Sequence, residues 1–517
     1  MLRRPTALLA ALATAAALGS CSVVGGARER VGSGPAPTVT PQAPPPGSEG
    51  LERFYTQALA WSECDGGRCA SLTVPLSYDD PDGATIGVDV LKVPASKRSA
   101  RVGSLVVNPG GPGGSGVDYA RAADVIVGAP VRQRYDVVGF DPRGVGRSEP
   151  IDCLTDSELD AFLGAEQTPD DPAEQAAFAA NATRFAEACG DNAGPLLGHV
   201  STVDAARDMD VLRSALGEEQ LDYLGKSYGT YLGAVYAGLF PTLVGRFVLD
   251  GALAPDLTSR ELNLGQAEGF ERATRAWAAS CVEEGDCPLG DSVDSVMEGM
   301  RAFLGELDLD PIQQTGDPSV PELTEAWAST GIAAAMYDEG SWPILSDALR
   351  DATAGDGTAL MQLAYQYADR RPGGGYTSNL MEVIYAVNCL DRPESSSVAE
   401  HAKEARESTA TAPTWGPLLM WSTLPCGSWP VTDAGSRQRP PPITAEGSGP
   451  IVVVGTTRDP ATPYEWAVRL RDQLANASLL TYEGDGHTAY TRSNACVDDA
   501  IDAYYVKGTV PKDGLRC

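Results

Sequence analysis

The sequence predicts an α/β fold in which a mostly parallel central sheet carries an inserted helical cap. Three observations lead to this prediction. From about residue 70, strand-like and helix-like patterns alternate, as expected where helices connect the strands of a sheet. Several strand candidates are short, continuous apolar runs, which are typical of parallel strands buried on both faces. Residues 256–410 then hold helical patterns with few strand candidates, and strand patterns resume at about 450.

Eight segments are predicted as strands. The first two alternate between apolar and polar residues, which favours antiparallel strands at a sheet edge, and the others are continuous apolar runs typical of buried parallel strands. In chain order they are 71–78, 85–94, 104–108, 135–141, 221–225, 246–250, 450–455 and 477–482. Apolar residues at helical spacing predict helices over 204–216, 230–240, 265–284, 293–307 and 498–505.

The pattern divides the folded part of the chain into three segments. We expect the first part of the core over 51–255, the helical cap over 256–410 and the C-terminal part of the core over 411–517. Scattered aromatic side chains in the cap are expected to form its own core, with a minority lining a pocket.

The N-terminus has the features of an export signal. Arg3 and Arg4 precede a short apolar stretch, 7–18, and then Leu-Gly-Ser-Cys ending at Cys21. This arrangement predicts a cleaved signal rather than a membrane-spanning helix. The four residues Leu-Gly-Ser-Cys resemble a bacterial lipobox, in which the cysteine, here Cys21, becomes the lipidated first residue of the mature protein. Ordinary signal cleavage near the same place is the alternative. Residues 22–50, rich in Pro, Gly, Ser and Ala, predict a flexible linker. The protein is therefore expected at the outer face of the cell membrane, or released from it.

Charge and cysteine content restrict the function. The formal net charge is −31, which argues against nucleic acid as a partner because phosphates would be repelled. If Cys21 carries lipid, ten of the eleven cysteines remain, and an even number in an exported protein predicts disulfides. A metal site is not expected, because the chain has only three histidines and no Cys or His lies near Cys64 and Cys69 in the sequence to complete a ligand set. Spacing suggests the disulfides Cys64–Cys69, Cys153–Cys189, Cys281–Cys287, Cys389–Cys426 and Cys496–Cys517.

Residues 225–229, Gly-Lys-Ser-Tyr-Gly, lie between a predicted strand and a predicted helix. In that context G-x-S-x-G predicts a nucleophile elbow, a strained turn that presents the Ser227 hydroxyl. A serine nucleophile needs a histidine base, and the base needs a buried carboxylate. His487 and Asp459 each follow a predicted strand, so the chain order Ser227, Asp459, His487 is the one expected of an α/β-hydrolase.

Alternatives exist for the acid and the base. Asp250 ends a predicted strand and is the main rival to Asp459, whereas Asp485 is too close to His487 in the chain to orient it. Among the histidines, His401 lies in a charged helical stretch and is expected to be exposed, and His199 precedes a helix start.

A glycine-rich stretch, 108–116, follows the predicted strand 104–108. Its bare backbone N–H groups predict an oxyanion hole, with Gly111 N–H as one donor and Tyr228 N–H as the other. A phosphate-binding loop is the alternative, but no Gly-Lys-Ser/Thr ends the stretch. The later turn 141–148 is interpreted as structural.

Four motifs resemble those of a known family. They are G-G-P-G at 110–113, G-K-S-Y-G at 225–229, D-P-A-T-P at 459–463 and G-D-G-H at 484–487. They resemble the exported actinobacterial tripeptidyl aminopeptidases, α/β-hydrolases related to proline iminopeptidases, and mycobacterial lipoprotein relatives described as serine proteases or carboxylesterases. The resemblance spans about 50–517.

The resemblance implies roles for particular residues. Ser227, Asp459 and His487 would be the catalytic triad, and Thr462 would support the site beside the acid. Asp391, next to Cys389, is the candidate for binding the substrate's free amine, with a surface cap or turn as the alternative. Lys226 departs from the family pattern, in which an uncharged residue often precedes the serine.

The function that the resemblance implies is removal of short peptides, as tripeptides, from free N-termini, through an acyl-enzyme and with no cofactor. A carboxylesterase or lipase on the same core is the alternative, because both reactions are acyl transfer; an endoproteolytic serine protease is another. An inactive, hydrolase-like binding protein is the third possibility, although such proteins usually lack a triad member and none is missing here. The expected partners are peptide or protein substrates, and the membrane through the lipid anchor alone.

Overall fold

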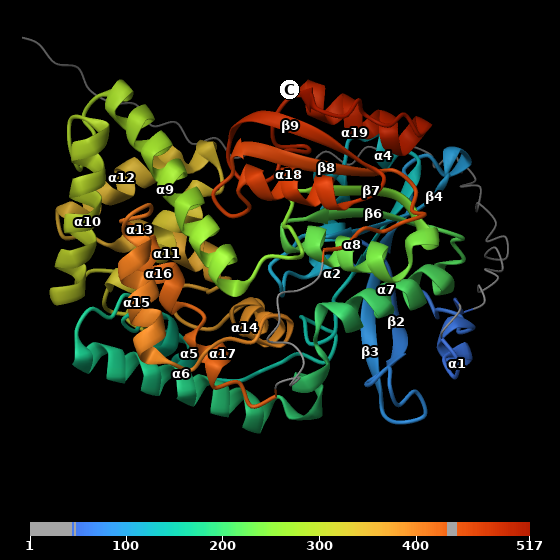
Figure 1. Cartoon of the computed structure of the whole chain (residues 1–517), viewed down its shortest axis with the longest axis horizontal. Coiled ribbons are helices and arrows are strands. Elements are labelled where there is room, and N and C mark those ends of the chain that lie inside the picture. The colour runs from blue at the N-terminus through green and yellow to red at the C-terminus, as the bar shows by residue number, and fades with distance from the viewer. Residues whose placement is uncertain (1–43, 46–47, 432–441) are drawn as a thin grey trace, which may run out of the picture. The chain divides into compact units, whose positions relative to one another are not determined.

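The computed structural model describes residues 44–45, 48–431 and 442–517. A single ten-stranded sheet runs through one side of the molecule (Figure 1), in the order β1-β2-β3-β5-β4-β6-β7-β8-β9-β10. The signal 1–21, with Cys21, and nearly all of the linker lie outside the described residues. The strands are β1 (Ser62–Cys64), β2 (Gly67–Pro75), β3 (Thr85–Val93), β4 (Gly103–Asn108), β5 (Tyr135–Phe140), β6 (Leu221–Lys226), β7 (Val244–Asp250), β8 (Ile451–Arg458), β9 (Ala477–Asp485) and β10 (Leu515–Arg516).

All eight predicted strands are present, and β1 and β10 are short additions at the two edges. β1, β2 and β3 pair antiparallel, and β3 is antiparallel to β5. From β5 to β10 every pairing is parallel. The predicted antiparallel edge and parallel centre are therefore confirmed. This sheet brings the carboxyl ends of β6, β7, β8 and β9 to one edge, where catalytic groups gather in α/β folds.

Alternate side chains of the central strands bury two separate hydrophobic cores. Tyr223, Phe247 and Val453 point to the face covered by α1 (Glu52–Tyr55), α7 (Thr202–Leu216), α8 (Tyr228–Leu239) and α18 (Tyr464–Gln473). Leu224 and Val248 point to the opposite face, covered by α2 (Gly116–Arg121), α3 (Ala123–Ile126), α4 (Ala129–Arg132) and α19 (Ala495–Lys507). Burial on both faces explains why these strands are continuous apolar runs in the sequence.

The remaining helices form a lobe beside the sheet (Figure 1). Two of them, α5 and α6, precede residue 256, and two others, α16 and α17, follow residue 410; α6 packs on α17, and α15 packs on α16. The segment boundaries themselves stay predictions. The helices of the lobe are α5 (Asp156–Leu163), α6 (Pro172–Asn192), α9 (Ser259–Glu284), α10 (Val293–Leu309), α11 (Glu325–Met336), α12 (Trp342–Thr353), α13 (Thr358–Ala368), α14 (Leu380–Asp391), α15 (Val398–Ser408), α16 (Gly416–Trp421) and α17 (Leu424–Gly427).

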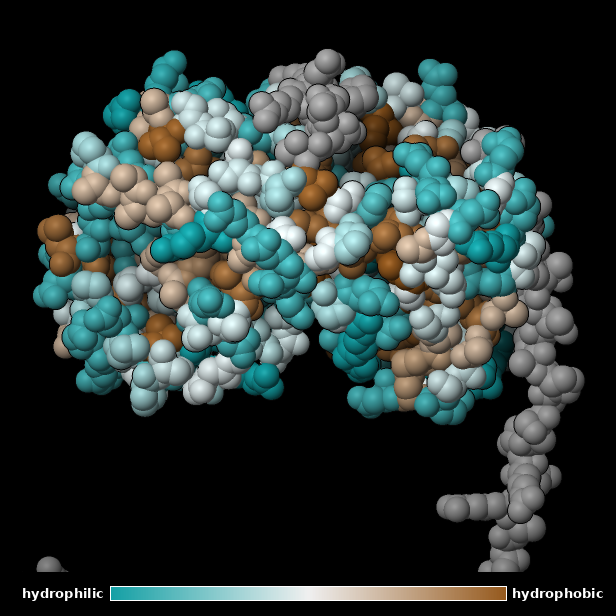
Figure 2. Space-filling view, turned by 90° about the horizontal axis from the view of Figure 1, so that it is seen from below, coloured by the Kyte–Doolittle hydropathy of each residue, from teal (hydrophilic) through white to brown (hydrophobic). Residues whose placement is uncertain are grey.

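The large hydrophobic residues that the described chain exposes come from separate segments of the sequence. On the side shown in Figure 2, hydrophobic side chains are interspersed with hydrophilic ones. Within the described part of 256–431, the large exposed hydrophobic residues are Leu309 and Ile344. No helix among the described residues is both long and apolar enough to cross a membrane.

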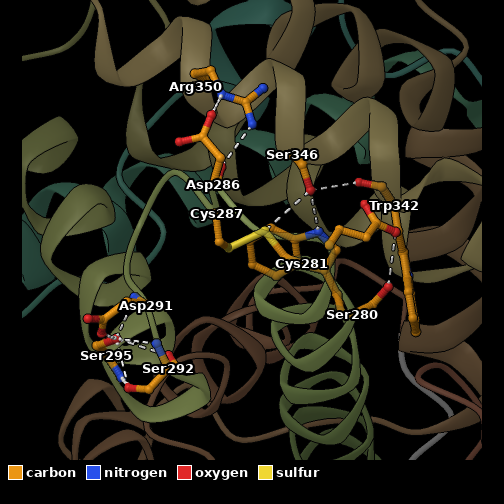
Figure 3. The surroundings of a disulfide bond; sticks show 12 residues. Ser280, Cys281, Asp286, Cys287, Asp291, Ser292, Ser295, Trp342, Ser346 and Arg350 are labelled. Carbon is orange, nitrogen blue, oxygen red and sulfur yellow. Dashed lines mark hydrogen bonds and ion pairs between the residues drawn. A yellow bond between two sulfur atoms is a disulfide. The ribbon is translucent and has the colours of Figure 1, made fainter.

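Five disulfides join the cysteine pairs that the spacing suggests. Figure 3 shows one of them, Cys281–Cys287, which ties the end of α9 to the loop that follows it. Arg350 of α12 donates a hydrogen bond to the carbonyl of Asp286 in the same loop, at 3.1 Å (Figure 3). Disulfides of this number are typical of proteins that fold outside the reducing cytosol.

Candidate active site

Ser227 lies in the sharp turn between β6 and α8. Its backbone has φ +56° and ψ −127°, a sparsely populated conformation for a residue with a side chain. The Ser227 N–H donates to the carbonyl of Asp250 at the end of β7, at 2.9 Å. The flanking glycines are required sterically, because a Cβ on Gly225 would lie 2.3 Å from the carbonyl oxygen of Gly229. The local structure is therefore the strained elbow that the sequence predicts.

His487 and Asp459 are hydrogen-bonded to each other. The imidazole Nδ1 lies 2.9 Å from each carboxylate oxygen of Asp459, and both side chains are buried. The carboxylate also accepts hydrogen bonds from the N–H groups of Ala461 and Thr462, at 3.0 and 2.8 Å. Thr462 Oγ1 lies 3.3 Å from His487 Nδ1. A fixed, desolvated carboxylate on Nδ1 leaves Nε2 as the nitrogen that can accept a proton.

Gly251 connects the histidine to the nucleophile. A Cβ on this glycine would lie 3.2 Å from His487 Cε1, and the preceding residue, Asp250, accepts the hydrogen bond from the Ser227 N–H. The described residues contain no hydrogen bond between Ser227 Oγ and His487. Such bonds are often long without substrate and tighten in the reacting complex.

The glycine-rich loop lies against the elbow. Gly110 and Gly111 have φ of +103° and +114°, values that favour glycine. A Cβ on Gly110 would lie 2.7 Å from the carbonyl oxygen of Lys226 and 3.1 Å from the backbone nitrogen of Tyr228. Asn108 Oδ1 accepts a hydrogen bond from the Gly110 N–H at 2.9 Å. The loop and the residue after the nucleophile therefore meet, as an oxyanion hole requires.

A cavity of about 310 Å³ opens beside Ser227. The sheet contributes the nucleophile and the glycine loop, and the helical lobe contributes most of the wall. Tyr337 also lines a second depression, together with His487. The Tyr337 ring packs edge-on against the imidazole, with the two ring centroids 5.2 Å apart. The lining residues include Gly111, Ser227, Tyr228, Asn263, Gln266, Phe270, Tyr337, Met381, Ile384, Tyr385, Asn388, Arg392, Leu418, Thr423, Cys426 and Thr462.

Known proteins resemble this chain along nearly its whole length. A family model described as TAP-like protein matches residues 412–517. Serine protease Hip1 of Mycobacterium tuberculosis is 36% identical over 486 residues, covering 89% of this chain and 91% of the relative. Carboxylesterase B of the same organism is 36% identical over 503 residues, with 95% and 94% covered. The tripeptidyl aminopeptidase of Streptomyces lividans is 33% identical over 483 residues, with 90% and 87% covered.

The chain belongs to the tripeptidyl-aminopeptidase-like family of α/β-hydrolases. As a member of this family the protein is a serine hydrolase. The family includes proteins named as peptidases and one named as an esterase. Membership therefore indicates acyl transfer as the type of reaction but does not identify the substrate.

Lys226, the residue that precedes the nucleophile, points away from the cavity. Its Nζ donates to the carbonyl of Tyr490 at 2.7 Å and lies 3.6 Å from the Asp250 carboxylate. Burial lowers the Lys226 pKa, and Asp250 opposes that shift. Asp250 also accepts hydrogen bonds from the N–H groups of Ala489 and Tyr490, both at 2.9 Å. The pair therefore anchors the loop that follows His487, and Asp250 does not serve as the histidine's partner.

Asp391, the residue expected to bind the substrate amine, has another contact. Its carboxylate accepts a hydrogen bond from the Thr202 N–H at 2.9 Å and another from the Thr202 hydroxyl. That hydroxyl also bonds the Tyr228 hydroxyl at 2.6 Å. Burial raises the Asp391 pKa to about 6. Asn388 and Arg392 of the same segment line the cavity, and Asp391 does not, so amine binding by Asp391 stays a prediction that its contacts in this structure do not favour.

The cavity wall on α14 follows a sequence pattern that lies outside the four motifs. Met381, Ile384, Tyr385, Asn388 and Arg392 follow helical spacing and all line the cavity. Residues at such intervals share one face of a helix. Asp391 falls beside this stripe, which explains why its carboxylate turns elsewhere.

His401 is buried, not exposed as its charged neighbours indicate. Only 3% of it is exposed. Its ring nitrogens bond the carbonyls of Met420 and Ser395, at 2.9 and 3.0 Å, and the ring stacks on Trp421. Both nitrogens are occupied by these structural contacts, so His401 is not a candidate base.

Three carboxylates in the helical lobe lie close enough to hold a metal ion. Ligand oxygens of Glu166, Asp308 and Glu325 are all within 4.8 Å of one another. Burial raises the pKa of Glu166 to about 8 and that of Glu325 to about 7, so they can share protons instead. None of them lines the Ser227 cavity.

Proposed function

We propose that this protein is a serine peptidase that removes short peptides, as tripeptides, from the free N-termini of peptides or proteins. The observation that carries the proposal is the His487–Asp459 pair, hydrogen-bonded at 2.9 Å and buried beside the elbow that holds Ser227. The three residues act as a catalytic triad.

The reaction proceeds in two steps of acyl transfer. Ser227 Oγ attacks the scissile carbonyl as His487 Nε2 takes its proton, and Asp459 stabilises the imidazolium that forms. The N–H groups of Gly111 and Tyr228 donate to the oxyanion. Collapse of the intermediate returns the proton to the leaving amine and leaves an acyl-enzyme on the serine. Water, deprotonated by the same histidine, then releases the acid.

The size and position of the cavity support a short acyl portion. Its volume of about 310 Å³ is at the lower end of the range for small-ligand sites. Its far wall is formed by α14 and by the segment around Thr423 and Cys426, which the Cys389–Cys426 disulfide joins. A cavity closed by helices suits the end of a chain better than the middle of one, which favours an exopeptidase over an endoprotease.

One observation favours a carboxylesterase as the second candidate. Within the described part of the chain, no Asp or Glu lines the cavity, so a substrate ammonium would contact the amide oxygens of Asn263, Gln266 or Asn388 instead of a carboxylate. A lipase is less well supported, because the described helices of the lobe expose only Leu309 and Ile344 as large hydrophobic residues.

Three substrates separate these functions. We expect a tripeptide anilide with a free amine to be cleaved with a higher kcat/KM than its N-acetylated analogue and than a short-chain ester. A preference for the blocked peptide would contradict the aminopeptidase, and a preference for the ester would favour the carboxylesterase. Labelling with a fluorophosphonate tests the nucleophile: a folded protein without an adduct on Ser227 would overturn the triad.

We also propose that Cys21, which lies outside the described residues, carries the lipid that anchors the protein to the outer face of the membrane. Metabolic labelling with palmitate should mark the wild-type protein and not the Cys21→Ala variant. Equal labelling of both would contradict the anchor.

A further inference from the structure

Arg392 is a buried cation in the wall of the Ser227 cavity. It directly follows α14 and caps that helix, and only 8% of it is exposed. Among the described residues that line the cavity, it has the one charged side chain. A guanidinium stays protonated at any physiological pH, so the cavity carries a permanent positive charge.

This guanidinium is incompletely paired. Its Nε donates to the carbonyl of Leu257 at 3.3 Å, and its central carbon lies 4.5 Å from the ring centroid of Tyr231. Its Nη2 is buried and has no hydrogen-bond partner. No carboxylate of the described residues lies within ion-pair distance of it, although its charge acts on the neighbouring Asp391 carboxylate and opposes the rise of that pKa. Of the buried side-chain nitrogens and oxygens without a partner in the described chain, only Arg392 Nη2 belongs to a cavity-lining residue.

Arg143 shows how this chain satisfies a buried guanidinium elsewhere. It forms two hydrogen bonds of 2.7 Å with the Asp208 carboxylate, and its remaining N–H groups donate to three backbone carbonyls. An unpaired buried charge is unfavourable by several kcal/mol unless a partner arrives. The contrast indicates that the partner of Arg392 comes from outside the chain.

The position of Arg392 indicates which part of the substrate its guanidinium can contact. Tyr231, which its guanidinium faces, lies four residues after Ser227 on α8, about one helical turn or roughly 6 Å along the axis. The Tyr231 ring also contacts the Tyr228 ring, with centroids 6.2 Å apart. An extended tripeptide spans about 10 Å. Because Ser227 and Arg392 line the same cavity, a tripeptide that acylates Ser227 is long enough to extend toward the guanidinium.

A carboxylate fits this site best. The planar fork of arginine matches a carboxylate in two parallel hydrogen bonds. The formal net charge of −31 gives an acidic ligand no long-range attraction, so its recognition has to be local.

We propose that Arg392 is a specificity residue that binds a carboxylate of the acyl portion of the substrate, an acidic side chain within the three residues before the scissile bond. The proposal rests on the proposed peptidase function. It names the substrate class as peptides whose N-terminal segment contains Glu or Asp.

Matched substrates test it. Tripeptide anilides carrying Glu or Gln at each of the three positions in turn are compared by kcat/KM on the full-length, disulfide-intact protein. At one position we expect Glu to exceed Gln by roughly tenfold to a hundredfold, the range of a charge-assisted hydrogen bond. Arg392→Gln should reduce that ratio to about one. Arg260→Gln removes the same charge from an exposed, ion-paired arginine on neighbouring α9 and should leave the ratio unchanged.

A binding measurement separates this proposal from the proposed function. Calorimetry on the Ser227→Ala variant measures the affinity of the Glu and Gln peptides without any turnover. A Glu preference there, with no hydrolysis by wild-type protein, would reject the peptidase and keep the carboxylate site. Equal kcat/KM and equal affinity for Glu and Gln at every position would overturn the proposal, and so would an unchanged ratio in Arg392→Gln. If Arg392→Gln does not fold, as judged by its melting curve, Arg392→Lys replaces it: a reduced ratio supports the proposal and an unchanged one contradicts it.

Discussion

Gly110→Ala is the sharpest test of how the glycine loop meets the nucleophile. The new Cβ would lie 2.7 Å from the Lys226 carbonyl oxygen and 2.8 Å from Ser227 Cβ, where ordinary contact begins at 3.4 Å. The loop would therefore have to move by about 0.7 Å, since neither contact can rotate away. A displacement of this size removes one oxyanion donor from its position, and losing one donor reduces kcat by roughly 10²–10³. We expect kcat/KM to fall about 10²-fold, equivalent to about 2.7 kcal/mol.

The assay uses a short-chain nitrophenyl ester, so that peptide specificity does not enter. The matched control is Gly355→Ala, because Gly355 has φ +96° but a Cβ there would meet nothing within 4 Å. Gly355→Ala introduces the same kind of backbone strain as Gly110→Ala, about 1–3 kcal/mol, but no steric clash. We expect both variants to melt a few degrees lower and only Gly110→Ala to lose activity. A folded Gly110→Ala protein with kcat/KM within about twofold of wild type would refute the reasoning.

Three further predictions concern the buried pairs. Asp459→Asn should lower kcat about 10⁴-fold in steady-state assays, because the amide fixes the wrong imidazole tautomer; a loss below tenfold would remove Asp459 from the triad. Lys226→Met leaves the Asp250 carboxylate without its cation and should lower the free energy of unfolding in urea by about 3–5 kcal/mol; adding Asp250→Asn should recover part of this loss, and strict additivity would show that the two residues are uncoupled. Replacing Cys389 and Cys426 by Ser opens a disulfide with a sequence separation of 37 and should cost about 4 kcal/mol; an unchanged melting temperature would contradict that estimate.

The sheet could be predicted because strands that are buried on both faces consist of consecutive apolar residues. A strand such as β8 is covered on both faces, so Ile451, Val452 and Val453 are all apolar and the run stands out. β10 has only two residues, too few for any pattern. The packing of α6 on α17 joins segments more than 200 residues apart, and no local pattern reports such a contact.

The site was predictable to the extent that its chemistry is local. The elbow needs glycines within two residues of Ser227, and Asp459 and His487 each follow a strand, so these positions follow from motif and chain order. The direction of a side chain on a helix is different, because one residue changes it by about 100°. Asp391 and Arg392 are neighbours in the chain. The Asp391 carboxylate accepts a hydrogen bond at the start of α7, from Thr202, whereas the Arg392 side chain lines the cavity.

Reaction and specificity come from different parts of this molecule. The glycine loop and Ser227 precede α9–α17 in the chain, and Asp459 and His487 follow these helices, so the sheet brings the proposed catalytic groups together. The opposite wall belongs largely to α9, α14 and the segment around α16 and α17. A substitution on the α14 stripe, such as one at Arg392, can therefore change which substrate is bound without moving the His487–Asp459 pair. One acyl-transfer core can serve both peptide and ester substrates, and a family whose members are named as a protease, a carboxylesterase and an aminopeptidase fits this division.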